Sequence, residues 1–166
     1  MSRTRSPSIT EHLSVTSGSF GSTAAIVTSV GLIVGFGAVT GSRAAVVSAL
    51  LIVAVADNIT DSLSIHIYQE SENIDVRPAL RATVVNFLAR LVITSSFVVL
   101  VVVLPATMVA AASACWGLVL LATLSFLLAQ RRQVSPAREI CIHLGVAVAV
   151  VVVSRALGIA IRAFVQ

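Results

Sequence analysis

Five long apolar stretches dominate this sequence, and each is long enough to cross a lipid bilayer. A hydrocarbon core about 30 Å thick requires about 20 mostly apolar residues in a helix. The apolar stretches cover residues 20–40, 44–67, 79–105, 107–130 and 137–164. Short polar segments separate them, and Pro105 ends the third because its ring interrupts helical hydrogen bonding. The sequence therefore predicts an all-α polytopic membrane protein with five transmembrane helices.

The composition supports this class and excludes others. Hydrophobic residues make up 57% of the chain and charged residues 11%, whereas soluble domains average about 25% charged residues. This excludes an ordinary soluble enzyme, a disordered chain and a disulfide-stapled secreted module. The many valines would favour strands in water, but in lipid an open strand leaves backbone groups unpaired. We expect a polar N-terminal tail over residues 1–18 and one five-helix transmembrane domain over residues 19–166.

The arginines predict how the chain is oriented in the membrane. All eleven basic residues are arginine, and with five spans the N-terminal tail and the second and fourth loops share one side. That side holds Arg3, Arg5, Arg77, Arg81, Arg131, Arg132 and Arg138, whereas the other side holds Arg43 and Arg162. Since cytoplasmic loops are enriched in basic residues, the N-terminus is predicted to be cytoplasmic. The arginines form no basic stripe for nucleic acid, so the expected partner is the lipid bilayer, in the cell membrane.

Charged residues inside the second and third spans require an explanation, because each costs about 2.5–3.5 kcal/mol on insertion scales. Asp57 and Asp61 are four residues apart and share one helix face. In the third span, Asn86 and Arg90 are likewise four residues apart and share one helix face. We expect a polar seam between the two helices, in which Arg90 faces Asp57 or Asp61.

Two interpretations of this seam remain open. Arg90 either forms a salt bridge that fixes helix packing, or belongs to an ion or proton pathway in which at least one carboxylate stays unpaired. One arginine cannot neutralise two carboxylates, which favours the pathway. Asp57, Asp61, Arg90 and Asn86 are therefore the predicted pathway residues. Asp57 and Asp61 are also the predicted ligands, because carboxylate oxygens suit a hard divalent cation.

Two further patterns predict weaker sites. Glu70 and Glu72 follow the second span and, with His66, offer metal ligands near the cytoplasmic interface. Gly31 and Gly35 form a GxxxG pattern in the first span. Small residues at this spacing allow close helix approach, often between subunits, and predict a homodimer.

Several segments resemble the vacuolar iron transporter family. In the first span, residues 20–21 and 26–29 resemble the family's aspartate-glycine pair and apolar-Thr-Thr stretch. Residues 56–61 resemble the alanine-aspartate-glycine-x-serine-methionine segment of its second helix, and residues 77–79 open the third helix as in the family. The resemblance implies a five-helix homodimer that exports iron(II) or manganese(II) from the cytoplasm in exchange for protons, along a path between the subunits.

The chain departs from the family at several ligand positions. Ala24 stands where the family has a metal-binding aspartate, Asp61 where it has a methionine ligand, and Ile65 where it has a glutamate. About ten polar residues replace its cytoplasmic metal-binding domain, and only Asp57 matches a family acidic position. We expect a transporter with a divalent cation as substrate, no permanently bound cofactor and no enzymatic activity. The alternative is a non-transporting membrane scaffold or interaction protein that keeps this fold.

Overall fold

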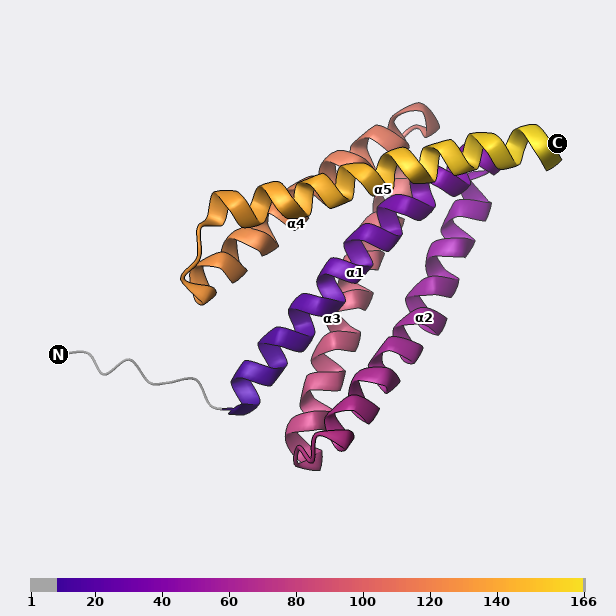
Figure 1. The fold of residues 1–166 in the computed structure, drawn as a ribbon. Coiled ribbons are helices and arrows are strands. Elements are labelled where there is room, and N and C mark those ends of the chain that lie inside the picture. Colours follow the sequence, from indigo (N-terminus) through magenta and orange to yellow (C-terminus); the bar gives the residue numbers. More distant parts are fainter. Residues whose placement is uncertain (1–8, 166) are drawn as a thin grey trace.

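The chain folds into five long helices. A computed structural model describes residues 9–165, with side chains from residue 18 onward. The helices are α1 (Ile9–Thr40), α2 (Arg43–Ser71), α3 (Val76–Val103), α4 (Ala106–Arg132) and α5 (Pro136–Val165) (Figure 1). All five are long and apolar enough to cross a membrane, counting α1 from Gly18. The predicted all-α fold with five membrane-spanning helices is confirmed, and the chain is an integral membrane protein.

The helix boundaries follow from local residue chemistry. Gly41 has a positive φ of 61°, which a glycine adopts without strain, and it separates α1 from α2. Ser42 then caps α2 by accepting a hydrogen bond from the Ala45 amide. Pro136 begins α5, where its missing N–H leaves no helical bond unmade. The main difference from prediction is that α1 begins at Ile9, inside the predicted polar tail.

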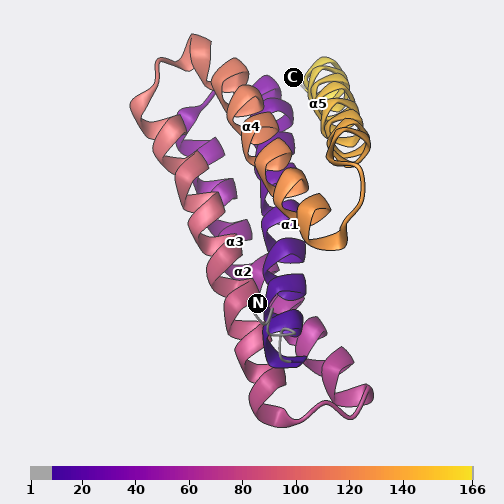
Figure 2. The ribbon, with the colours of Figure 1, turned by 90° about the vertical axis from the view of Figure 1, so that its left-hand side faces the viewer.

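Helix α1 lies at the centre of the arrangement and packs against the other four helices. Helices α2 and α3 lie side by side, and α4 and α5 form a second antiparallel pair (Figures 1 and 2). The turns at residues 41–42 and 104–105 lie on the same side of the molecule as the end of α5, which we call the C-terminal side. The turns at residues 72–75 and 133–135 lie toward the opposite, N-terminal side.

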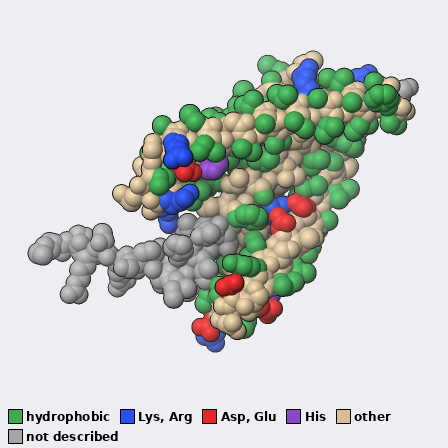
Figure 3. Space-filling view, in the orientation of Figure 1, with side chains coloured by type: hydrophobic (Ala, Val, Ile, Leu, Met, Phe, Trp, Pro, Cys, Tyr) green, Lys and Arg blue, Asp and Glu red, His purple; other side chains and the backbone are tan. Residues whose placement is uncertain are grey.

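The core is apolar and includes residues from every helix. Its largest buried side chains are Phe97 on α3, Ile26 on α1, Leu50 on α2 and Leu121 on α4. Outside this core, valines and leucines are exposed along the outer faces of α2 to α5. Figure 3 shows this apolar surface over most of the visible face. An apolar exterior of this extent suits contact with lipid and not with water.

The glycines of the predicted dimer contact lie against α5 of the same chain. A Cβ added at Gly31 would be 3.2 Å from the Ser154 hydroxyl, and one at Gly35 would be 2.9 Å from the Ser154 carbonyl oxygen. Gly158 on α5 lies against the Gly35 carbonyl in turn. The GxxxG pattern therefore serves a helix crossing within the chain, as small residues do in membrane proteins. The homodimer itself stays a prediction.

Candidate functional site

Three of the predicted pathway residues meet in one charged cluster, formed by Asp57, Asp61 and Arg90. From α3, the two terminal nitrogens of Arg90 donate hydrogen bonds to α2, Nη1 to Asp61 Oδ2 and Nη2 to Asp57 Oδ2. The arginine side chain is only 3% exposed, whereas those of Asp57 and Asp61 are 45% and 32% exposed. Arg90 thus contacts both carboxylates, whereas the pathway interpretation expects at least one of them to be unpaired.

The charged cluster lies at the middle of the membrane-spanning helices. Asp57 is at the midpoint of α2, and Arg90 is beside the midpoint of α3. About 20 Å of helix therefore separates the cluster from either end of α2. With both carboxylates ionised, the cluster carries a formal charge of −1 at the depth where an uncompensated charge is most costly.

Helix α1 covers the buried arginine through a glycine. A Cβ added at Gly21 would be 2.9 Å from the backbone oxygen of Asn86 and 3.0 Å from Cγ of Arg90. Any side chain at this position would push α1 away from α3 and expose the guanidinium stem. Sequence reasoning used Gly21 only for the family resemblance, because a single glycine carries no signal of its tertiary partner.

Buried amides flank the charged cluster between α2 and α3. The Asn58 side chain donates to the Phe87 carbonyl oxygen at 2.9 Å, and Asn86 donates to the Ser62 hydroxyl at 3.4 Å. The Oδ1 atoms of Asn58 and Asn86 are buried and accept no hydrogen bond. Asn86 was predicted; Asn58 and Ser62 were missed, although two polar residues four apart in an apolar span are a signal for an inward face. These orphan acceptors are groups that a water or a cation can satisfy.

The carboxylates open toward the outside of the single chain. Thr60 and Ser64 are exposed on α2 close to them, and both hydroxyls donate to carbonyls of their own helix. Figure 3 shows acidic and basic side chains meeting midway along the molecule within an apolar surface. Among residues 18–165, whose side chains the structure describes, no three His, Cys, Asp or Glu side chains lie close enough to hold a metal ion. A cation at the cluster would therefore have two carboxylates, with amide oxygens or water completing its shell.

The weaker predicted ligands, Glu70 and Glu72, lie elsewhere. Both are exposed at the N-terminal side, where Glu72 caps the end of α2. The His66 Nε2 atom is 3.6 Å from the Glu70 carboxylate. Because Glu70 lies 13 residues beyond Asp57, about 20 Å of helix separates them. The structure does not bring these glutamates to the charged cluster.

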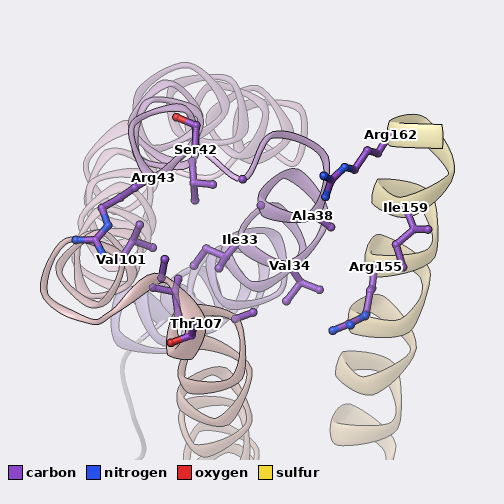
Figure 4. Close-up of a pocket in the computed structure, with 16 residues that line it drawn as sticks. Ile33, Val34, Ala38, Ser42, Arg43, Val101, Thr107, Arg155, Ile159 and Arg162 are labelled. Carbon is purple, nitrogen blue, oxygen red and sulfur yellow. The ribbon is translucent and has the colours of Figure 1, made fainter. Parts of the chain in front are cut away.

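A cavity of about 610 Å³ lies at the C-terminal side of the molecule, away from the charged cluster. Residues of all five helices line it, and three of them are arginines: Arg43, Arg155 and Arg162 (Figure 4). Neither Asp57 nor Asp61 is among its lining residues. The molecule thus has two separate polar regions, one acidic at mid-membrane and one basic at the C-terminal side.

Comparison with known proteins gives no relative. No protein-family model matches the chain, and no curated protein or solved structure matches it.

Proposed function

We propose that the chain transports a cation across the membrane along the outer face of α2, with Asp57 and Asp61 as the binding groups. The observation that carries the proposal is that two carboxylates share one arginine at the midpoint of the spanning helices. Charges inside a membrane are costly, and they mark ion or proton pathways by default. A structural salt bridge would need one carboxylate, whereas this cluster has two.

Arg90 limits how tightly the site can bind a cation. It extends from α3 to α2 and is buried beneath α1, so it stays in place while the half-exposed carboxylates accept a cation from the outer face. The arriving cation competes with the guanidinium for the same oxygens, which weakens its binding. Weak binding suits transport, because a cation that binds too tightly is not released.

The donor set favours a hard cation. Carboxylate and carbonyl oxygens are ligands that suit manganese(II). The vacuolar iron transporter family, which the sequence resembles, has a methionine at the position of Asp61, and its sulfur suits softer metals. The orphan Oδ1 atoms of Asn58 and Asn86 are further oxygen acceptors, buried between α2 and α3. We therefore propose manganese(II) or iron(II) as the substrate, with manganese preferred, and protons as the exchanged ion because the resemblance implies them.

A homodimer completes the site in this proposal. Side chains that are 45% and 32% exposed at mid-membrane would otherwise meet lipid. A second copy against the outer face of α2 would cover them and place a path between the subunits. The glycines Gly31 and Gly35 are occupied by α5, so the α2 face is the proposed contact.

The test is flux into liposomes that contain the purified protein and a metal-sensitive dye. We expect manganese(II) uptake by the wild type, and at least a tenfold loss in Asp57→Asn and in Asp61→Asn. Each variant leaves a neutral pair with Arg90, so both should unfold at or above the wild-type temperature. Thr60→Ala is the matched control, because Thr60 lies between Asp57 and Asp61 in the sequence and carries no charge. Unchanged flux in the folded aspartate variants would refute the proposal.

The second candidate is the non-transporting scaffold. Its support is that Arg90 bonds both carboxylates, which is also what a packing salt bridge would do. In this case the wild type moves no cation, and neither manganese(II) nor iron(II) changes its unfolding temperature. Flux above that of empty liposomes, lost in the aspartate variants, would exclude it.

A further inference from the structure

The cavity on the C-terminal side combines apolar walls with basic side chains. Ile33 and Val34 line it from α1 and Val109 from α4, while Arg155 and Arg162 line it from α5. No acidic residue contributes to its lining. At about 610 Å³, it is in the size range of cavities that hold small molecules. A ligand that matches it needs negative charge and apolar surface together.

Two of its arginines have no partner among the residues that the structure describes. Arg155 and Arg162 are seven residues apart, so they lie two turns apart on one face of α5. Figure 4 shows both side chains extending from α5 toward the space beside α1. Neither makes an ion pair or hydrogen bond with any residue of the described chain. Both guanidinium groups are therefore available to a ligand.

Arg43 is different, although it lines the same cavity. Its guanidinium donates to the carbonyl oxygens of Val102 at 2.9 Å and Leu104 at 2.8 Å. These carbonyls end α3 and have no helical donor of their own, so Arg43 caps that helix. In Figure 4 its side chain points away from Arg155 and Arg162. The positive charge available in the cavity is that of the two α5 arginines.

The depth of Arg155 identifies the class of ligand. It lies ten residues before the end of α5, which is about 15 Å along the helix. An unpaired guanidinium at this depth is costly unless an anion or water meets it. Phosphate is the anion that guanidinium groups bind best, because the planar fork matches its oxygens. A free phosphate would leave the aliphatic walls in contact with water, whereas a phospholipid fills them with an acyl chain.

We propose that this cavity binds one anionic phospholipid, with its phosphate at Arg155 and Arg162 and an acyl chain along Ile33 and Val34. The site shares no residue with the charged cluster, so lipid binding can be tested independently of cation transport. Lipid in this cavity would bridge α5 to α1, α2 and α4.

The experiment measures thermal unfolding of the purified protein in a neutral detergent, using fluorescence of the single tryptophan, Trp116. Phosphatidylglycerol should raise the unfolding temperature by about 5–10 °C at saturation. Phosphatidylcholine and inorganic phosphate should each give less than a third of that shift. Native mass spectrometry should find one tightly held phosphatidylglycerol per chain.

Variants test whether the lipid is in this cavity. Arg155→Gln combined with Arg162→Gln should abolish the phosphatidylglycerol shift. Arg131→Gln combined with Arg132→Gln is the matched control, because it removes the same charge from the exposed end of α4 and should keep the shift. Thr107→Phe narrows the cavity without touching either α5 arginine, and should reduce the shift. An equal shift with inorganic phosphate would assign a free-anion site, and equal shifts in both double variants would show only general charge attraction; either result overturns the proposal.

Discussion

At the scale of single residues, Arg90 determines what the mid-membrane site can do. It is the one buried charge among the residues that the structure describes, and it holds two carboxylates that are not buried. The asymmetry matters because a buried arginine is fixed by its surroundings, whereas half-exposed carboxylates can exchange partners. In the proposed function, Asp57 and Asp61 therefore bind the cation, and Arg90 is a positioning residue.

Replacing Arg90 with methionine should be severely destabilising. The change leaves two carboxylates close together at mid-membrane with no counter-charge, and an uncompensated carboxylate at that depth costs about 2.5–3.5 kcal/mol on insertion scales. Denaturant titration in detergent micelles measures the free energy of unfolding. Adding Asp57→Asn and Asp61→Asn to Arg90→Met should restore it to within about 1 kcal/mol of the wild type. A stable Arg90→Met protein would mean that the carboxylates do not depend on this arginine.

The same residues show what a sequence can and cannot predict. The four-residue spacing of Asp57 and Asp61, and their similar depth to Arg90, were enough to predict that α2 and α3 bring them together. Sequence could not predict that Arg90 bonds both carboxylates, because the position of its side chain depends on the close packing of α1 against α3 at Gly21. Nor did it identify the basic cavity, because the apolar walls beside Arg155 and Arg162 come from α1 and α4 and meet α5 only through tertiary packing.

At the scale of helices, close crossings organise the bundle around α1. Gly21 brings α1 against α3, and Gly35 brings it against α5 at Ser154 and Gly158. In lipid there is little hydrophobic driving force between helices, so such close van der Waals contact is what holds them together. The GxxxG spacing correctly indicated a close helix–helix contact of α1, but the spacing alone does not identify which helix α1 contacts.

Alanine at Gly158 should weaken the α1–α5 crossing. Its Cβ would collide with the Gly35 carbonyl and lie 3.0 Å from the Ala38 Cβ, and overpacking of this kind costs about 1–3 kcal/mol. Gly145→Ala is the matched control on the same helix, since nothing lies within 4 Å of a Cβ there. That variant should be unchanged or more stable by up to about 1 kcal/mol. The comparison uses unfolding free energies in micelles, and equal values for both variants would contradict the crossing.

At the scale of the whole molecule, the two polar regions lie at different places along the helices. The acidic cluster lies at the middle of α2, and the basic cavity lies at the C-terminal side. If the arginine count sets the orientation, the C-terminal side faces away from the cytoplasm, and the cavity contacts the outer leaflet. The direction of cation movement and the leaflet that supplies the lipid then depend on one property, the orientation of the chain.

Labelling of single cysteines tests that orientation. In a background with Cys115→Ala and Cys141→Ala, we place one cysteine at Ala44, next to the first turn, or at Ser135, in the turn before α5; both positions are exposed. Seven arginines against two should hold the N-terminal side in the cytoplasm. A membrane-impermeant maleimide added to intact cells should therefore label Ala44→Cys, and should label Ser135→Cys only after the membrane is opened. The reverse pattern would place the C-terminal side in the cytoplasm. Equal labelling of both positions would indicate that the chain inserts in two orientations, so that arginine asymmetry does not control its insertion.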